Sequence, residues 1–212
     1  MIALIDYKCG NIRSVEKALV AVGAQVQVTS SAQEIARATS LVLPGVGAFA
    51  DASASLDELD LAPLIRGRIL EGVPFLGICL GMHLLFEQGT ECPEGAALPG
   101  GLGLIPGVVD KLPREDAQGT LYKIPHVGWN AVTHTQENPL FAGIAQGEYF
   151  YFTHSYAAPE SAATIATTTH SITFPCAVQV GERAFGVQFH PEKSSDAGLA
   201  LLRNFVTLAK EC

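Results

Sequence analysis

One cysteine lies in a setting that favours nucleophilic chemistry. Cys79 follows the apolar run at residues 73–78 and has a glycine two residues away on each side, Gly77 and Gly81. This is the cysteine version of the G-x-S-x-G turn, in which a strand passes sharply into a helix and exposes the central side chain. The turn favours a thiolate and directs the backbone N–H of Leu80 toward a developing oxyanion. A buried cysteine between two packing glycines is the structural alternative.

A second group of candidate residues lies near the C-terminus. His190 ends a run of alternating apolar residues, and Pro191 and Glu192 follow it. In an extended chain, residues i and i+2 project to the same side, so the imidazole and the carboxylate can be adjacent. A carboxylate that holds one ring nitrogen leaves the other free to accept a thiol proton. We therefore expect a Cys79–His190–Glu192 triad; a solvated strand tip is the alternative for the last two.

The remaining histidines compete with His190 for the role of base. His83 is the serious rival, because it lies four residues after Cys79 on the helix face that looks back toward the turn. Four others have no carboxylate at a useful spacing, and a structural or exposed position is their default interpretation: His126, His134, His154 and His170.

Composition excludes several classes of protein. The 212 residues include 13 Lys and Arg against 21 Asp and Glu, and a net charge of −8 argues against nucleic acid or an anionic membrane as the partner. The most apolar stretch, residues 73–86, is shorter than the ~20 residues of a membrane helix. The five cysteines match no zinc spacing, and the N-terminus lacks the pattern of a signal peptide. We expect a cytoplasmic protein with no metal and no cofactor.

The periodicity of the chain predicts a mixed α/β domain over residues 1–212. Near-continuous apolar strands that alternate with helices indicate a parallel sheet covered on both faces. In the first half we expect strands at 2–5, 25–29, 40–43 (ended by Pro44-Gly45) and 73–78, and helices at 11–22, capped by Asn11, at 61–71 and at 80–88. In the second half we expect strands at 104–111, 126–133, 148–153, 163–169, 176–180 and 184–190, and a helix at 196–210.

With these motifs in place, the whole chain resembles the class I (triad) glutamine amidotransferases, and most of all the glutaminase subunits of imidazole glycerol phosphate synthase. Among the segments that carry the resemblance, IDYKCGNIRSV, PHVGWN and the KSS that ends GVQFHPEKSS are the distinctive ones. They separate these subunits from relatives in anthranilate, GMP, carbamoyl phosphate and pyridoxal phosphate synthesis. The segments are IDYKCGNIRSV, LPGVGAF, GICLGM, GLGLIPG, PHVGWN, YFTHSY and GVQFHPEKSS.

The resemblance implies a fold and a reaction. The fold is three-layered and flavodoxin-like, with a mixed, mostly parallel central sheet and added antiparallel strands. In the reaction, Cys79 attacks the carboxamide of L-glutamine and forms a γ-glutamyl thioester. His190, oriented by Glu192, protonates the departing ammonia and then activates water.

The resemblance also implies a substrate site. Val46 supplies the second oxyanion donor beside Leu80, and Gly47 in the same loop contacts the substrate; an ordinary β-turn is the alternative. Ser155 and Tyr156 hold the backbone of glutamine, although a strand end with polar tips is their structural alternative. Relatives carry glutamine where this chain has His83, so we expect His83 to bind substrate and the His83→Gln variant to stay active.

A partner follows from the same resemblance. It is the cyclase subunit, a (β/α)₈ barrel that forms a heterodimer with the glutaminase and uses ammonia to make imidazole glycerol phosphate and aminoimidazole carboxamide ribotide in L-histidine biosynthesis. Asn11, Trp129 and Lys193 lie in segments that relatives place near the interface, although sequence alone favours Trp129 as a core aromatic.

Three other classes of function remain as alternatives. One is a cysteine hydrolase or protease of the same fold, and another is a regulatory module with a degenerate site, which the presence of all three triad residues disfavours. A nucleotide-binding protein is the third, prompted by Gly10-Asn11 and the 44–47 turn, but neither segment has the spacing of a phosphate-binding loop.

Overall fold

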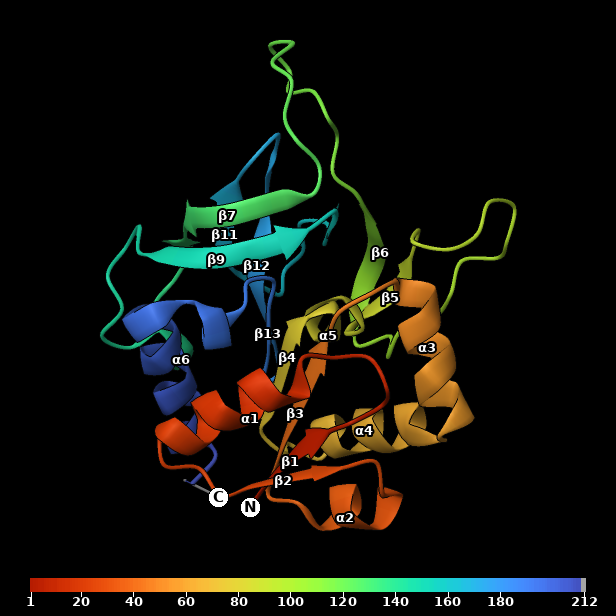
Figure 1. Cartoon of the computed structure of the whole chain (residues 1–212), viewed down its shortest axis with the longest axis vertical. Coiled ribbons are helices and arrows are strands. Elements are labelled where there is room, and N and C mark those ends of the chain that lie inside the picture. Colours follow the sequence, from red (N-terminus) through yellow and green to blue (C-terminus); the bar gives the residue numbers. More distant parts are fainter. Residues whose placement is uncertain (211–212) are drawn as a thin grey trace.

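The computed structural model describes residues 1–210 and is built on an eight-stranded sheet of order β2-β1-β3-β4-β13-β12-β11-β8 (Figure 1). The first five strands in this order run parallel, and β12, β11 and β8 add antiparallel pairs at one edge. The strands are β1 (Ile2–Ile5), β2 (Val26–Thr29), β3 (Ser40–Gly45), β4 (Phe75–Cys79), β8 (Thr133–His134), β11 (Thr164–Thr169), β12 (Thr173–Val180) and β13 (Ala184–Val187). This is the mixed, mostly parallel α/β sheet that the sequence predicts.

Helices cover both faces of the sheet. One layer contains α1 (Ile12–Ala21) and α6 (Ser195–Leu208), and the other contains α2 (Ala32–Arg37), α3 (Phe49–Glu58) and α4 (Leu61–Leu70) (Figure 1). Alternate residues of one strand supply the two cores: Leu4 packs with the α1/α6 layer, and Ile5 packs with the other. Burial on both faces explains why β1 is a continuous apolar run.

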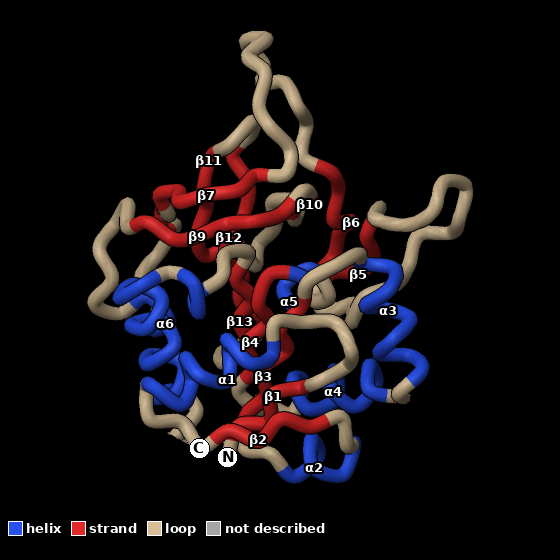
Figure 2. Tube along the Cα trace, viewed as in Figure 1, coloured by secondary structure: helices blue, strands red, loops and turns tan. Residues whose placement is uncertain are grey.

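Two small sheets extend from the carboxyl edge of the parallel strands (Figure 2). One contains β5 (Phe86–Gly89), β6 (Ile105–Lys111) and β10 (Tyr156–Ala157), and the other pairs β7 (His126–Ala131) with β9 (Tyr149–His154). The long connection between β6 and β7 projects away from the rest of the molecule. The short 3-10 turns η1 (Pro139–Phe141) and η2 (Pro191–Lys193) complete the described elements.

Several predicted boundaries were wrong, for local reasons. The helix expected at 80–88 is only α5 (Leu80–His83), because Phe86 begins β5 and pairs with β6. Strand β3 does not end at Pro44 but continues to Gly45, since the fixed φ of proline suits an extended chain. Asn11 precedes α1 as expected, but its side chain makes no capping hydrogen bond.

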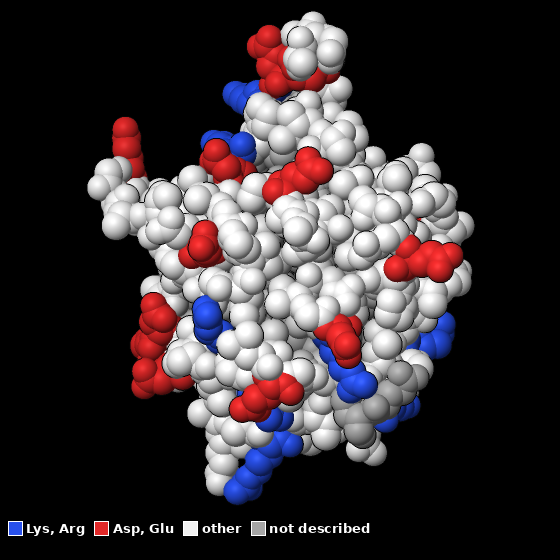
Figure 3. Space-filling view, turned by 180° about the vertical axis from the view of Figure 1, so that it is seen from behind, with Lys and Arg blue, Asp and Glu red and all other residues white. Residues whose placement is uncertain are grey.

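Charges are mixed over the surface. On the face shown in Figure 3, acidic and basic side chains are interleaved from the protruding connection to the lower half of the molecule. Within residues 1–210, no helix is both long and apolar enough to cross a membrane. Four cysteines in this part of the chain, Cys9, Cys79, Cys92 and Cys176, are free thiols, and Cys212 lies outside the described residues.

Candidate active site

The sharp turn predicted at Cys79 is present, but the expectation of an exposed side chain was wrong, because Cys79 is only 6% exposed. Cys79 is the last residue of β4, its φ is 54°, and α5 begins at the next residue. Few residues other than glycine adopt such a φ, and such strain is typical of functional sites. A Cβ on Gly77 would overlap the carbonyl oxygen of Gly81, and one on Gly81 would overlap that of Leu43. The two glycines are therefore required by the close approach of three backbone segments.

Adjacent parallel strands bring the histidine to the cysteine. Strand β13 pairs with β4, and the chain continues from β13 to His190, so both side chains lie at the carboxyl edge of the sheet. The backbone N–H of His190 donates to the carbonyl of Tyr151 at 2.9 Å, and the hydroxyl of Ser194 donates to the carbonyl of His190 at 2.6 Å. Strand β9 and the start of α6 therefore fix the position of the imidazole.

Glu192 contacts His190 through a geometry other than the predicted one. The two residues do not share an extended strand, because Pro191–Lys193 forms the 3-10 turn η2. The turn still brings Oε1 of Glu192 to 2.9 Å from Nδ1 of His190, with the two side chains 1% and 2% exposed. Nε2 of His190 has no hydrogen-bond partner among the described residues, so it is free to exchange a proton.

The charges around His190 determine its protonation. Burial lowers its pKa, but Cys79 and Glu192 both favour the charged ring and together raise the pKa to about 9. Cys79 contributes to this shift although its Sγ makes no hydrogen bond to Nε2 of His190 in this structure. Because folding raises this pKa from 6.5, His190 stabilises the fold fully below pH 6.5 and loses this effect as pH rises through about 9.

A pocket of about 320 Å³ opens beside Cys79. The structure brings all six oxyanion and substrate candidates into its wall, whereas His190 and Glu192 are buried and do not line it. The six are Val46, Gly47, Leu80, His83, Ser155 and Tyr156. They come from the β3–α3 turn, from α5, and from the segment that joins β9 to β10 and the start of β10. Strand register places Gly45 directly opposite Cys79.

Two residues near the nucleophile were not found from the sequence. Glu91 lines the pocket, where its Oε2 accepts a hydrogen bond from the backbone N–H of Phe49 at 3.2 Å and burial raises its pKa. No motif marks it, because it follows β5 in an irregular loop. The second is Tyr7, which is fully buried with an unpartnered hydroxyl and would touch any side chain placed on Gly45.

The other histidines are not paired with carboxylates. Nε2 of His83 bonds to Gln188, and His126 contacts His154 and stacks on His170 with ring centroids 4.2 Å apart. Among residues 1–210, His190 is the one histidine within ion-pair distance of a carboxylate. The described residues also contain no grouping of three or more His, Cys, Asp or Glu that could hold a metal ion.

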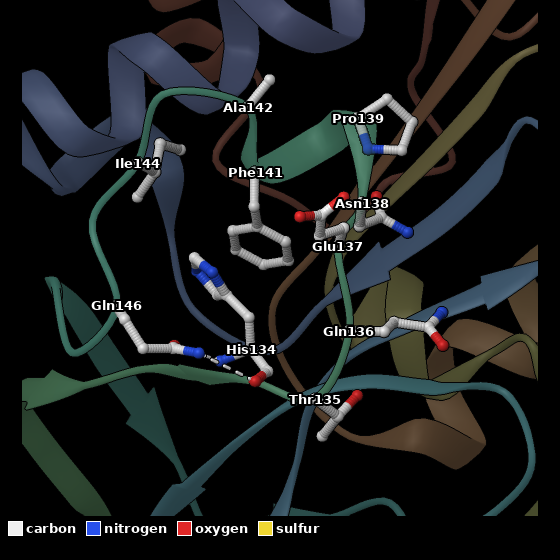
Figure 4. A pocket seen from close by; sticks show the side chains of 10 residues that line it. All are labelled: His134, Thr135, Gln136, Glu137, Asn138, Pro139, Phe141, Ala142, Ile144 and Gln146. Atoms are coloured by element: carbon white, nitrogen blue, oxygen red, sulfur yellow. Dashed lines mark hydrogen bonds between the residues drawn. The ribbon is translucent and has the colours of Figure 1, made fainter.

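A larger hollow of about 720 Å³ is lined from His134 to Gln146 and contains none of the candidate residues (Figure 4). His134 packs against Phe141 with ring centroids 4.3 Å apart, and its backbone exchanges hydrogen bonds with the side chain of Gln146. No cysteine is among the residues that line this hollow.

The three interface candidates differ in exposure. Trp129 is 51% exposed on the outer face of the β7–β9 pair, so its interpretation as a core aromatic was wrong. It lies beside Tyr151, and Nζ of Lys193 lies 5.9 Å from the centre of the Tyr151 ring. Asn11 is at the start of α1, which contacts η2.

Comparison with known proteins supports the glutamine amidotransferase family that the sequence motifs resemble. Residues 3–209 match the family model described as glutamine amidotransferase class-I. Imidazole glycerol phosphate synthase subunit HisH 1 of Methanococcus maripaludis is 45% identical, with 98% of this chain and 100% of the relative covered. Subunit HisH of Shouchella clausii is 42% identical, with 99% of each chain covered.

The fold is likewise similar to a crystal structure of a glutamine amidotransferase, with a TM-score of 0.73 at 19% identity over 99% of this chain and 100% of the other. The chain therefore belongs to the class I glutamine amidotransferase family of enzymes, and within it to the HisH group.

Proposed function

We propose that this chain hydrolyses L-glutamine to L-glutamate and ammonia through a Cys79–His190–Glu192 triad. The observation that carries the proposal is the juxtaposition of a strained cysteine, which lines a pocket, with a buried imidazole held by a carboxylate. The family and the HisH relatives support glutamine as the substrate. We also infer that residues 1–212 form a single amidotransferase domain, because one sheet runs from β1 to β13.

The first half-reaction forms a thioester. Sγ of Cys79 attacks the carboxamide carbon, and the carbonyl oxygen becomes an oxyanion that the backbone N–H groups of Leu80 and Val46 stabilise. His190 holds the proton on Nε2 and donates it to the leaving nitrogen, so ammonia departs and the γ-glutamyl group stays on sulfur. The unpartnered state of this Nε2 leaves it available for the transfer.

The second half-reaction returns the enzyme to its starting state. The neutral Nε2 of His190 accepts a proton from water, and the resulting hydroxide attacks the thioester carbon. The C–S bond breaks, glutamate leaves, and the proton remains shared between the imidazole and the thiol. Glu192 holds Nδ1 at 2.9 Å throughout and compensates the positive charge on the ring.

Glu91 supplies the charge that a free amino acid requires. It is the carboxylate in the pocket wall, beside Gly47 and Tyr156, and we propose that it pairs with the α-ammonium group of glutamine. The Glu91→Gln variant is expected to raise KM for glutamine roughly 10–100-fold, with kcat changed less than about threefold, because the ion pair forms equally in ground and transition states.

Glu94→Gln is the matched control for this prediction. Glu94 lies in the same loop but is exposed and outside the pocket, so its removal should leave KM unchanged. Steady-state measurement of glutamate release checks both variants. An unaltered KM in Glu91→Gln would remove the carboxylate from the substrate site.

The Glu192→Gln variant tests the orienting carboxylate. Loss of its charge lowers the pKa of His190, which Glu192 helps to raise to about 9. We expect kcat/KM to fall by about 10²-fold or more, and the alkaline limb of its pH profile to move at least about one unit lower. Glu58→Gln, which removes a surface ion pair with Lys8, is the control. An alkaline limb that stays in place would contradict the role of Glu192.

We further propose that the enzyme is cytoplasmic and acts as the glutaminase subunit of a heterodimer. The HisH relatives support a cyclase subunit as the partner, which takes up the ammonia to form imidazole glycerol phosphate and aminoimidazole carboxamide ribotide in L-histidine biosynthesis. The exposed aromatic face around Trp129 and the nearby Lys193 suit a docking surface next to the active site, with Asn11 at its margin.

Glutamate release by the purified chain, alone and with cyclase and its ribotide ligand, tests this partnership. We expect slow turnover alone and an acceleration of about 10²-fold or more when both are added, since coupling prevents the waste of glutamine. The Trp129→Ala variant should require more cyclase for half-maximal acceleration. Equal rates with and without cyclase would overturn the assignment.

A further inference from the structure

A pair of buried polar side chains outside the triad lies against the nucleophile. Gln188 is fully buried, two residues before His190, and its Nε2 donates a hydrogen bond to Sγ of Cys79 at 3.7 Å. Its Oε1 lies 2.6 Å from Nε2 of His83, which is 4% exposed. The three residues therefore form one chain of contacts, from His83 through Gln188 to the thiol.

The protonation of His83 determines which groups donate and which accept in this series of hydrogen bonds. Burial lowers the pKa of His83 to about 4, although its bond to Gln188 partly opposes the shift, so the ring is neutral near pH 7. A neutral imidazole has one N–H, and the carbonyl oxygen of Gln188 can only accept. The proton must therefore be on Nε2 of His83, and Nδ1 is left as an acceptor.

The opposite tautomer would reverse the amide. A ring with its proton on Nδ1 would accept from the NH₂ group of Gln188 and rotate the amide oxygen toward Sγ. An oxygen dipole would then face a developing negative charge, whereas the observed orientation presents an N–H donor. The choice between these two arrangements is made by His83 and not by Gln188, because a carboxamide is nearly symmetric in shape.

We propose that His83 is a positioning residue, whose Nε2–H fixes the Gln188 amide so that the amide N–H stabilises the thiolate of Cys79. The inference rests on the proposed role of Cys79 as the nucleophile. It gives His83 a function that does not require contact with substrate. Glutamine at position 83 can also donate a hydrogen bond to Gln188, so the two residue types are interchangeable in this role.

Other ionisable groups act on the same sulfur. His190 and the hydroxyl of Tyr7 both interact with Cys79, Glu192 acts through His190, and His154 faces His83. The contribution of His83 must be measured as a difference between variants.

The test is the pH dependence of Cys79 alkylation by iodoacetamide, quantified by mass spectrometry of the Cys79 peptide. The His83→Met and Gln188→Met variants remove the donor and the amide. We expect the midpoint of their profiles to move about one pH unit higher and the rate at pH 7 to fall about five- to tenfold. His83→Gln and the packing control Leu84→Met should stay within about 0.3 pH units of the wild type. A His83→Met profile that coincides with the wild type would overturn the inference.

Steady-state kinetics separate positioning from substrate contact. Loss of positioning lowers kcat with little change in KM, whereas loss of a direct contact raises KM. Because alkylation requires no glutamine, a shifted profile in a chain that hydrolyses no glutamine would overturn the proposed function and keep this inference.

Nitrogen NMR of the wild-type protein gives a measurement that needs no variant to fold. We expect the His83 ring to carry its proton on Nε2 between pH 5.5 and 8. A proton on Nδ1 would reverse the amide and overturn the inference.

Discussion

Replacement of Cys79 by serine is expected to reduce glutamine hydrolysis at least about 10³-fold. Serine fits the same turn, since it is close to cysteine in size, and should leave stability nearly unchanged. Its hydroxyl is a far weaker acid than a thiol, so His190 cannot hold the pair in the charged form that attacks the carboxamide. Release of glutamate from saturating glutamine measures the effect, and the unfolding midpoint shows that the variant is folded.

Covalent labelling separates loss of the nucleophile from damage to the site. An electrophilic analogue, 6-diazo-5-oxo-L-norleucine, should modify the wild type once, at Cys79, and glutamine should protect against it. The Cys79→Ser variant should not be labelled, and Cys9→Ser, which changes a half-buried thiol outside the triad, should behave as the wild type does. Turnover at the normal rate in Cys79→Ser, or labelling that glutamine does not slow, would refute the proposed nucleophile.

Replacement of Gly81 by alanine is expected to lower the free energy of unfolding by at least about 3 kcal/mol, and so to lower the melting temperature by about 6–12 °C. The added methyl group would overlap the carbonyl oxygen of Leu43. Neither backbone can move away easily, because β3 and β4 are paired along their length and Gly45 lies opposite Cys79. The rate of glutamine hydrolysis should fall by more than the loss of folded protein explains, since any shift of the backbone moves the strained Cys79.

Gly67 offers a matched control on the same side of the sheet. It lies within α4, and a Cβ there would meet no atom within 4 Å. Gly67→Ala should therefore raise stability by about 0.5–1 kcal/mol, because alanine favours a helix more than glycine does. Urea unfolding of the two variants gives the comparison. Equal stability in Gly81→Ala and the wild type would contradict the close approach at the turn.

The parts of the site that the sequence predicted are those fixed by local geometry. The glycine spacing around Cys79 predicted the turn because only glycine permits such close backbone contacts, and the φ of 54° confirms the geometry. The spacing of His190 and Glu192 predicted their contact, but a 3-10 turn produces it in place of an extended strand. A separation of two residues allows both conformations, so the pattern could not choose between them.

Features that depend on distant contacts were missed. Leu84 and Leu85 are apolar like the preceding helix, so nothing local marked the end of α5; the pairing of β5 with β6 determines it. Sequence alone favoured Trp129 as a core aromatic, but distant elements determine which face of β7 is covered, and Trp129 proved half-exposed. His83 and Gln188 are 105 positions apart, and only the neighbouring strands β4 and β13 bring them together.

In the proposed catalytic cycle, the raised pKa of His190 also sets the order of events. Cys79 causes part of the rise in the pKa of His190, and it does so only while its sulfur can carry negative charge. When the γ-glutamyl group is bonded to sulfur, that charge disappears and the imidazolium becomes a stronger acid. It then readily loses its proton to the departing nitrogen and becomes the neutral base that water requires. When the thioester is cleaved, the negative charge returns to the sulfur of Cys79 and restores the proton affinity of His190. The charge on Cys79 therefore determines when His190 acts as an acid and when it acts as a base.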